Sequence, residues 1–461
     1  MKNKHLLAKN VLFLCSDCLR ADRIYGYHRD LIPNIRKLMN ESVYFTKAFS
    51  VGPNTPNSYP SIFGHIYPSE TSRLGFIPKS VETVAETFAR NGYSTYGFNA
   101  GNAWVSEYWG YDRGFADFQS HLNLSSTPDS RLISGRRLDY KTRLYNSLRN
   151  LALLMKSKAA SNASVLNALR KIYPRKLLKL YRYLFLSKKL YLNKRELEKV
   201  FSEEILSQIQ GIDRVPFFMW AHFMTTHSPF VPVKRKFSNN HDIRKSNYLR
   251  QDDKLVDLYD DCVFTFDHYV GNIVDLLKAK NLFDSTIIII CGDHGDLLGA
   301  GHRGRHHPSK LIPELIRIPL IIKFCHSKVS GQVDEMFSVI GLFASVFRYL
   351  GLSYKVEKDI NSFEVQGNKL IVRNNEFIYL EARGFQDAFA ARCRGTGDVS
   401  IYGIMNKDCF LRYNSKYGTY EGVKEDGERR KLTDVLSRHI QRNLTNREKY
   451  RLRDRICQMR L

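Results

Sequence analysis

The feature that most limits how this chain can fold is a series of short, almost continuously apolar runs. They read VLFLC (11–15), PFFMWAHF (216–223), STIIIIC (285–291) and IPLIIKF (318–324). Strands that are apolar on both sides are typical of a parallel sheet buried between two layers of helices. Amphipathic helical patterns lie between these runs, which gives a repeated strand–helix alternation. The sequence therefore predicts an α/β fold with a mostly parallel central sheet flanked by helices.

The strand patterns change after about residue 330. They become shorter and contain more Gly and Asn, as in KLIVRNNEFIYLEARG and DVSIYGIMNKDCFLRYN. Short strands bounded by turn residues are typical of an antiparallel sheet. We therefore expect a large α/β domain over 1–330, of a size typical of enzymes, and a smaller α+β subdomain over 331–461. The subdomain is expected to contain a small antiparallel sheet and a basic terminal helix.

Residues 130–200 have a different composition and predict a basic helical insertion. They contain 19 Lys and Arg against 3 acidic residues, which supplies most of the formal net charge of +25. Leu and Tyr recur among the charges at roughly helical spacing. Such a segment is either a solvated helical cover over the core or a surface that meets anionic lipid or a polyanionic substrate. Specific nucleic-acid binding is not expected, because no zinc-finger, RRM-like or P-loop pattern accompanies the charge.

The N-terminal segment and the cysteines indicate the compartment. The apolar stretch near the start is broken by Ser16 and Asp17, and no uncharged run reaches the roughly 18–20 residues of a membrane span. The eight cysteines are too few to suggest a disulfide scaffold. Cys15 and Cys18 form a CxxC, but no second CxxC or nearby His pair completes a zinc site. We expect a cytoplasmic protein with peripheral membrane contact through 130–200 as an option.

Polar clusters follow two of the apolar runs and fill one loop. Asp17 ends the first run, and Asp293 and His294 end the third within CGDHGD. Ligands of doubly wound sheets bind at the carboxyl ends of the strands, so these clusters are expected to converge. A carboxylate–imidazole pair in a glycine-flanked turn suits a divalent cation. The loop GPNTPNSYPSIFGHIYP carries hydroxyls at Thr55, Ser58 and Ser61.

Taken together, these motifs resemble the sulfatase branch of the alkaline phosphatase superfamily. The resemblance rests on NVLFLCSDCLRAD, on the hydroxyl loop closed by Tyr67-Pro68, and on CGDHGD followed about twenty residues later by ELIRIPLIIK. It spans most of the chain from 10 to 350 and leaves the basic segment and the far C-terminus weakly covered. It implies an alkaline phosphatase-like fold and an enzyme that acts on ester bonds.

The resemblance also implies a nucleophile. The family's nucleophile begins a Cys-x-Pro-Ser-Arg motif at a fixed interval before Tyr-Pro, and counting back from Tyr67-Pro68 reaches Thr55. Ser58 is the rival, because Ser58-Tyr-Pro-Ser imitates the start of the motif. Neither residue is a cysteine, so the formylglycine of sulfatases cannot form here. Unmodified threonine is the nucleophile in the phosphodiesterase and the phosphoglycerol or phosphoethanolamine transferase branches. Tyr59 replaces the family's Arg, and Cys18 replaces its second Asp.

One divalent metal ion (Mn, Mg or Ca) is implied, with Asp17, Thr55, Asp293 and His294 as ligands. Two-metal members carry a carboxylate near the position of Thr225 or Thr226, which favours a single ion here.

The remaining site residues are expected to act on the substrate. His222 and His227 match histidines that contact the anion oxygens or protonate the leaving group. The substrate-binding candidates are Arg20, Ser58, His306, His307 and Lys310. Counting cannot separate His306 from His307, Lys310 is an alternative to both, and Arg20 has a structural ion pair as its alternative.

These residues support three hypotheses. The leading one is a metal-dependent hydrolase or transferase that acts on a phosphate ester through a covalent threonine intermediate, on a lipid or glycan bearing glycerophosphate or ethanolamine phosphate. The second is a sulfate-ester hydrolase (sulfatase) without formylglycine. The third is a catalytically degenerate binding protein, which the lost Asp, Arg and Cys would permit.

Overall fold

The computed structural model describes most of the chain outside the basic segment. The described residues are 9–26, 30–71, 74–121, 187–213, 215–243, 246–247, 252–298, 306–355, 360–373, 376–383, 401–414, 419–422 and 426–443. Of the predicted insertion 130–200, only 187–200 falls within these ranges. The remainder of that prediction lies outside the described residues.

A nine-stranded sheet forms the centre of the molecule, in the order β4-β3-β5-β1-β6-β7-β2-β8, with β9 also pairing with β2. All neighbours pair in parallel except β7, which runs antiparallel to both β6 and β2. The predicted mostly parallel sheet is therefore confirmed. Its strands are β1 (Asn10–Ser16), β2 (Val43–Phe49), β3 (Ser94–Asn99), β4 (Asp117–Ser120), β5 (Phe217–Phe223), β6 (Thr286–Gly292), β7 (Arg317–Lys323), β8 (Gly331–Val333) and β9 (Phe337–Ser338).

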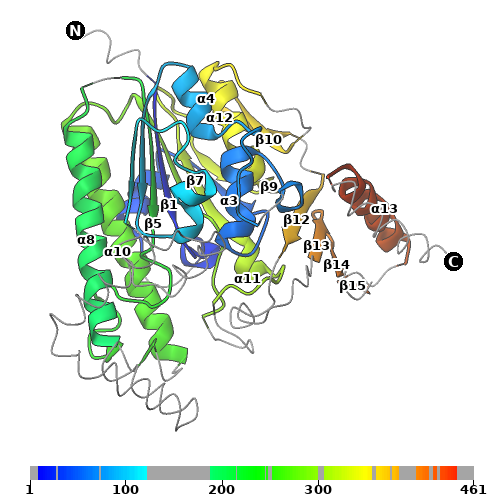
Figure 1. Ribbon diagram of the computed structural model, residues 1–461, viewed down its shortest axis with the longest axis horizontal. Coiled ribbons are helices and arrows are strands. Elements are labelled where there is room, and N and C mark those ends of the chain that lie inside the picture. Colours follow the sequence, from blue (N-terminus) through cyan, green and yellow to red (C-terminus); the bar gives the residue numbers. More distant parts are fainter. Residues whose placement is uncertain are drawn as a thin grey trace, which may run out of the picture.

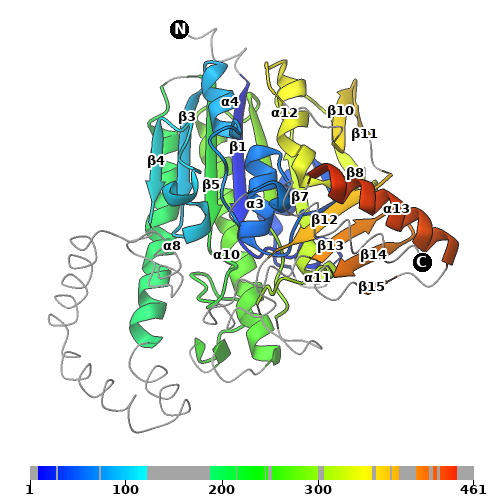
Figure 2. The same ribbon diagram turned by 45° about the vertical axis from the view of Figure 1, so that its right-hand side comes forward.

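Two layers of helices cover this sheet (Figures 1 and 2). One face packs against α2 (Pro33–Met39), α8 (Ser187–Gln210) and α10 (Asp252–Ala279), and the other against α3 (Thr55–Gly64), α4 (Val84–Arg90) and α12 (Leu342–Leu350). A short helix, α11 (Pro313–Ile316), leads directly into β7.

The side-chain alternation along β1 shows why the run had to be apolar throughout. Leu12 and Leu14 belong to the core beneath α10, whereas Val11, Phe13 and Cys15 belong to the core beneath α3 and α12. All five side chains are fully buried. Burial of a large apolar side chain stabilises the folded state by about 1.5–3 kcal/mol. Because both sides of β1 are buried, a charged residue on either side would be unfavourable.

The C-terminal part contains two small antiparallel sheets, which confirms the predicted change of pattern. The first is the hairpin β10 (Ser362–Gln366) and β11 (Lys369–Arg373), and the second consists of β12 (Ile378–Ala382), β13 (Ile401–Met405), β14 (Phe410–Asn414) and β15 (Thr419–Glu421). Helix α13 (Asp426–Asn443) packs on the second sheet through Leu432 and Leu436.

This second sheet is fastened to the beginning of α3. Asn57 and Arg383 exchange two hydrogen bonds of 2.9 Å, from the amide of each to an oxygen of the other. The guanidinium of Arg383 also donates to the carbonyl oxygens of Pro68 (2.7 Å) and Thr71 (2.9 Å). Ser69 donates from both its backbone N–H and its hydroxyl to the buried carboxylate of Glu381, at 2.7 Å each. The loop that carries the predicted nucleophile is thus held from the C-terminal side.

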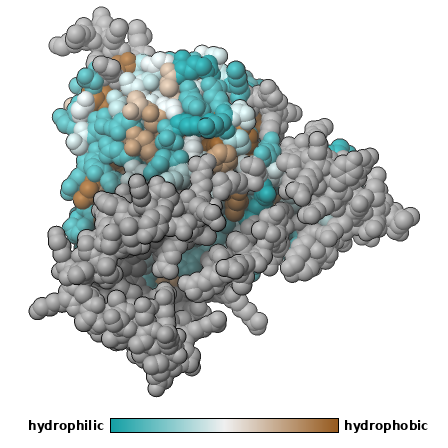
Figure 3. Space-filling model, in the orientation of Figure 1, coloured by the Kyte–Doolittle hydropathy of each residue, from teal (hydrophilic) through white to brown (hydrophobic). Residues whose placement is uncertain are grey.

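The face drawn in Figure 3 is mainly hydrophilic, with apolar residues in small separate groups. Within the described residues, no helix combines the length and the apolar character that crossing a bilayer requires.

Candidate active site

The polar strand ends gather at one edge of the central sheet. Strands β3, β5, β1 and β6 are consecutive parallel neighbours, so their carboxyl ends lie together. Asp17 follows β1 directly, Asp293 follows β6 directly, and His222 lies near the end of β5. This is the edge at which open α/β sheets bind ligands.

Thr55 reaches this edge from the first turn of α3. Its hydroxyl donates a hydrogen bond to Asp293 Oδ2 at 3.0 Å. The same oxygen lies 3.3 Å from His294 Nε2 and 3.5 Å from Asp17 Oδ2. Thr55 is 3% exposed and the other three residues are fully buried. The structure therefore brings together the four residues that the sequence selected as ligands, although Asp17 and Asp293 are far apart in the chain.

Ser58, the rival nucleophile, occupies a different position. It lies one helical turn after Thr55, and its hydroxyl is 3.4 Å from the carbonyl oxygen of Thr55. A hydroxyl bonded back to its own helix is not presented to the carboxylates. Of the two hydroxyls, only that of Thr55 is within hydrogen-bond distance of the acid–histidine cluster in the described structure.

The buried charges in this cluster perturb one another. Burial by itself would raise the pKa of Asp17, but His227 and the hydrogen-bonded His222 hold it well below its usual range. Burial and the neighbouring charge of Asp17 raise the pKa of Asp293 well above its usual range. Burial, together with the nearby His307, lowers the pKa of His294 to about 3. Two buried carboxylates side by side are costly unless a cation neutralises them.

The donor set fits a divalent cation. Asp17, Asp293 and His294 each offer a ligand atom within 4.8 Å of the others. His294 Nδ1 lies 2.8 Å from the carbonyl oxygen of Gly295, so Nδ1 carries the proton and Nε2 presents its lone pair to the carboxylates. Gly295 must be glycine for this turn, because a Cβ there would lie 2.0 Å from the carbonyl oxygen of Glu314.

Asn102 is a site residue that sequence analysis did not predict. Its Nδ2 donates to Asp17 Oδ2 at 2.7 Å and to the Thr55 hydroxyl at 3.2 Å, and it lies 3.3 Å from His222 Nε2. Asn99, at the end of β3, fixes it by bonding its backbone N–H and its carbonyl at 2.8 Å each. The available signal was NAGNAW, a segment with two asparagines at the carboxyl end of the strand Ser94–Asn99.

His222 and Tyr59 form a buried pair beneath the site. His222 Nδ1 lies 2.6 Å from the Tyr59 hydroxyl, and its Nε2 lies 3.4 Å from Asp17 Oδ2. Tyr59, which stands where the family has an arginine, is also fully buried. Its ring therefore supports His222 from below and puts no positive charge into the site.

The structure separates the two histidines that counting left together. His307 turns toward the cluster, with its ring centroid 4.6 Å from that of His294 and 5.2 Å from that of His227. His306 is exposed, as is Lys310, the alternative to both. His227 faces the site, and its buried Nδ1 has no hydrogen-bond partner among the described residues.

Arg20 forms an ion pair with Asp22 at the edge of the site. Its guanidinium binds both carboxylate oxygens of Asp22, at 2.8 and 2.9 Å, and donates to the carbonyl oxygen of Asp296 at 2.6 Å. The ion-pair alternative is therefore present in the structure.

A lysine from α8 contacts the loop that carries His227, and sequence analysis did not predict this contact. Lys194 Nζ donates to the carbonyl oxygens of His227 and Pro229, the second at 2.9 Å. Burial lowers its pKa. On the same helix, the Glu198 carboxylate accepts the Thr225 hydroxyl at 2.5 Å. The described end of the basic segment thus braces the loop that carries His227.

The family follows from the chain as a whole. Residues 9–352 match the family model Sulfatase. The chain therefore belongs to the sulfatase family. Because the match covers most of the chain, the family prediction made from the motifs is confirmed.

Individual relatives are more distant. The chain is 24% identical over 196 residues to the multifunctional alkaline phosphatase superfamily protein PehA of Trinickia caryophylli, a match that covers 33% of this chain and 37% of PehA. The chain covers less than two thirds of the length of the curated relatives that it matches.

Two solved structures show the same fold. The phosphonate monoester hydrolase SpPMH of Silicibacter pomeroyi has a TM-score of 0.64 at 15% identity, with 95% of this chain and 96% of that chain covered. BT4656, solved in complex with its substrate D-glucosamine-2-N,6-O-disulfate, has a TM-score of 0.61 at 12% identity and covers 95% and 98%. The predicted alkaline phosphatase-like fold is confirmed by these structures.

Proposed function

We propose that the protein is a metal-dependent hydrolase or transferase that acts on phosphate esters through a covalent intermediate on Thr55. The observation that carries this proposal is the position of the Thr55 hydroxyl, 3.0 Å from Asp293 Oδ2 and 3.3 Å from His294 Nε2. Asp17, Asp293 and His294, with Thr55 itself, would hold the cation. When bound, a divalent cation supplies Lewis acidity, which stabilises an alkoxide and the negative charge of the transition state.

The protein groups around Thr55 support attack by this hydroxyl. Asp293 Oδ2 accepts a hydrogen bond from the Thr55 hydroxyl, so it is placed to take the proton as the oxygen attacks phosphorus. The new bond joins Thr55 Oγ1 to phosphorus, and the bond from phosphorus to the leaving oxygen breaks. Burial lowers the pKa of His227 to about 4, so its imidazole is neutral near pH 7. His227, whose buried Nδ1 is unbonded within the described residues, is therefore the proposed hydrogen-bond donor to the oxygens of the anion, the leaving oxygen included. Asn102 donates toward Thr55 and fixes it in the attacking position.

The second half of the reaction restores threonine. Water or an alcohol attacks the phosphorus of the phosphothreonine, the bond from phosphorus to Thr55 Oγ1 breaks, and Oγ1 regains its proton from Asp293. The product is phosphate or a phosphate monoester in a hydrolase and a new phosphate ester in a transferase. The choice of phosphorus over sulfur follows from position 55. Thr55 cannot form the hydrated aldehyde that sulfatases use. An unmodified alkoxide leaves a covalent ester that must be attacked at the central atom in the second step.

Assay of the purified full chain on aryl phosphate diesters, phosphate monoesters and sulfates tests this proposal, with Mn²⁺, Mg²⁺, Ca²⁺ and Zn²⁺ added singly. We expect metal-dependent turnover of phosphate esters at least tenfold above that of the matching sulfate. Turnover of the sulfate alone would contradict the proposal. The absence of any turnover, with no metal retained, would favour a degenerate binding protein, consistent with the lost Arg and second Asp.

A sulfatase without formylglycine is the second candidate. It is favoured by the family model over residues 9–352 and by the likeness to BT4656, a protein solved with a sulfated sugar. The assay described above separates the two candidates, because both leaving groups are the same aryl alcohol and only the central atom differs.

We also propose a cytoplasmic protein whose basic segment meets an anionic surface. The support is the 19 to 3 excess of basic over acidic residues in 130–200. Sedimentation with phosphatidylserine-containing liposomes should be strong at low salt and fade as salt rises, because charge attraction to the surface is screened over about 8–10 Å near 0.1–0.15 M salt. Neutral phosphatidylcholine liposomes are the control. Salt-insensitive or absent binding would contradict this proposal and leave the segment as a cover for the core.

A further inference from the structure

The thiol of Cys18 belongs to the site, although the proposed reaction does not use it. Cys18 follows Asp17 in the turn after β1 and is fully buried. Its backbone is left-handed, with φ 65°, a strained conformation for a residue that has a Cβ. Two hydrogen bonds maintain this turn, since Cys18 N donates to Asp293 Oδ1 at 3.1 Å and the Tyr259 hydroxyl donates to the Cys18 carbonyl oxygen at 2.7 Å. The turn presents Sγ to the acid–histidine cluster.

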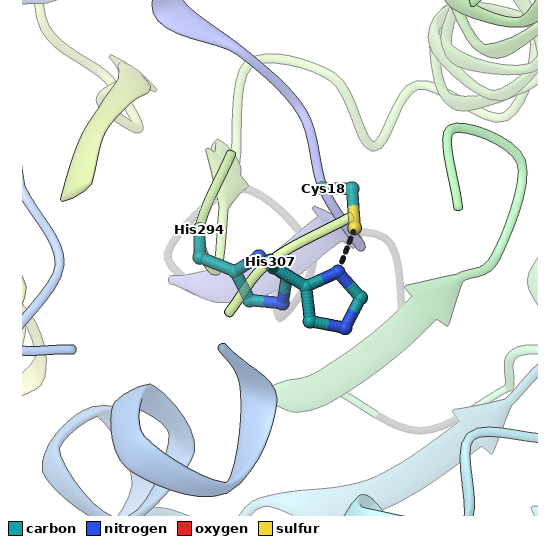
Figure 4. A group of neighbouring side chains, drawn as sticks. All are labelled: Cys18, His294 and His307. Atoms are coloured by element: carbon teal, nitrogen blue, oxygen red, sulfur yellow. Dashed lines mark hydrogen bonds between the residues drawn. The ribbon is translucent and has the colours of Figure 1, made fainter. Parts of the chain in front are cut away.

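Two imidazole rings meet this thiol. Cys18, His294 and His307 each offer a ligand atom within 4.8 Å of the others. Figure 4 shows the ring of His307 next to the sulfur atom of Cys18 and the ring of His294 beside that of His307. Cys18 Sγ lies 3.5 Å from His307 Nδ1 and 3.1 Å from Asp17 Oδ1. That Asp17 oxygen is also 3.4 Å from His294 Nε2.

These separations are those of ligands around one cation. Zinc ligands lie about 2.0–2.3 Å from the metal, which places neighbouring ligand atoms of a regular tetrahedron about 3.3–3.8 Å apart. The 3.5 Å between Cys18 Sγ and His307 Nδ1 lies in this range, as does the 3.4 Å between His294 Nε2 and Asp17 Oδ1. The 3.1 Å between Cys18 Sγ and Asp17 Oδ1 is slightly shorter. Asp17, Cys18 and His227 form a further set of possible ligands in the same place.

The chemistry of the donors selects the cation. Ca²⁺ and Mg²⁺ prefer oxygen ligands, whereas thiolate and imidazole favour Zn²⁺ and related ions. We propose that Cys18 is a ligand of the active-site cation and that this cation is thiophilic, of the zinc class, held by Cys18, His294 and His307 beside Asp17.

This inference rests on the metal site of the proposed function but not on Thr55 as nucleophile. His294 Nε2 is common to the oxygen-rich set and to the thiol set, and it lies 3.3 Å from the Thr55 hydroxyl. A cation bound through Cys18 therefore stays next to Thr55. The sequence-based expectation of Mn, Mg or Ca followed from the family's oxygen ligands, one of which is a cysteine here.

Cobalt binding tests the inference without any activity measurement. Co²⁺ substitutes for Zn²⁺ and gives an intense thiolate-to-cobalt charge-transfer band only when sulfur is a ligand. The full chain should bind one equivalent of Co²⁺ with this band, and Zn²⁺ should displace it. In Cys18→Ser the band should disappear and the affinity for Zn²⁺ should fall at least 100-fold. Cys409→Ser, which alters a half-buried cysteine between β13 and β14, is the matched control and should keep both properties.

A second variant keeps the result decisive. Cys18→Asp replaces the sulfur with oxygen and should shift the preference at least tenfold toward Mn²⁺ or Ca²⁺ over Zn²⁺, measured by competition. Circular dichroism of both variants checks that the fold is intact. Cobalt bound by the full chain without a charge-transfer band would overturn the inference while leaving the metal site in place. The failure of every cation to bind would overturn the metal site of the proposed function as well.

Discussion

Thr55→Ala should remove the covalent phospho-enzyme and lower kcat by about 10⁴-fold or more, because a nucleophile acts together with its activating groups and cannot be replaced by binding alone. The Thr55 hydroxyl is the oxygen that contacts Asp293, His294 and Asn102. The measurement is mass spectrometry of the enzyme trapped with an aryl phosphate substrate, together with steady-state kinetics. Thr55→Ser should restore the labelled enzyme, because it keeps the hydroxyl in the first turn of α3.

Ser58→Ala is the comparison for this experiment. Ser58 lies three residues after Thr55 on α3, and its hydroxyl bonds to the Thr55 carbonyl oxygen. Loss of this hydroxyl should therefore leave the covalent label in place. A label that persists in Thr55→Ala and vanishes in Ser58→Ala would move the nucleophile to Ser58 and contradict the geometry. Thermal unfolding midpoints of both variants equal to that of the wild-type protein would exclude a loss of structure as the cause.

His294→Gln should abolish tight metal binding and lower turnover by about 10³-fold, since a catalytic cation contributes several kcal/mol to the transition state and each 1.36 kcal/mol is a factor of ten. His294 is shared by the Asp17–Asp293–His294 set and the Cys18–His294–His307 set, so its loss weakens binding of the cation in either of these two positions. Metal at 100 times its Kd should stabilise the wild-type protein by about 2.7 kcal/mol, and this gain should vanish in the variant. Differential scanning calorimetry with and without metal measures it.

His268→Gln provides the control for the histidine change. His268 lies on α10, where its Nδ1 contacts the carbonyl oxygen of Phe264 at 2.9 Å. This variant should keep the metal-dependent rise in the unfolding midpoint. A rise of the same size in His294→Gln would show that the cation binds elsewhere and would contradict the proposed ligand set.

The sequence was sufficient for the fold class and for the positions of four central strands. The runs at 11–15, 216–223, 285–291 and 318–324 correspond to β1, β5, β6 and β7 within about one residue at each end. They were legible because a strand covered on both faces has to be apolar at every position. The antiparallel direction of β7 could not be predicted from the sequence. The direction of a strand depends on the path of the chain between β6 and β7, and not on the composition of the strand.

Within the site, the sequence selected residues whose motif and position agree. Thr55, Asp17, Asp293 and His294 were found because strand ends converge and the family's motifs mark them. Asn102 and Lys194 were missed, because their placement depends on contacts made across the folded chain. The same holds for the thiol set: Cys18 and His307 are 289 positions apart, and no local pattern joins them.

The exchange between Asn57 and Arg383 has a consequence for the reach of the family resemblance. The match to the family ends at residue 352, yet Arg383 is hydrogen-bonded to Asn57 on α3, the helix that carries Thr55, the proposed nucleophile. A shortened chain that stops at the end of the match would retain every residue of the proposed reaction. It would lose the hydrogen bonds from Arg383 that hold Asn57, two residues after Thr55. Substitutions beyond the matched domain can therefore change the orientation of Thr55, and with it the rate of the proposed reaction, while every reacting residue stays the same.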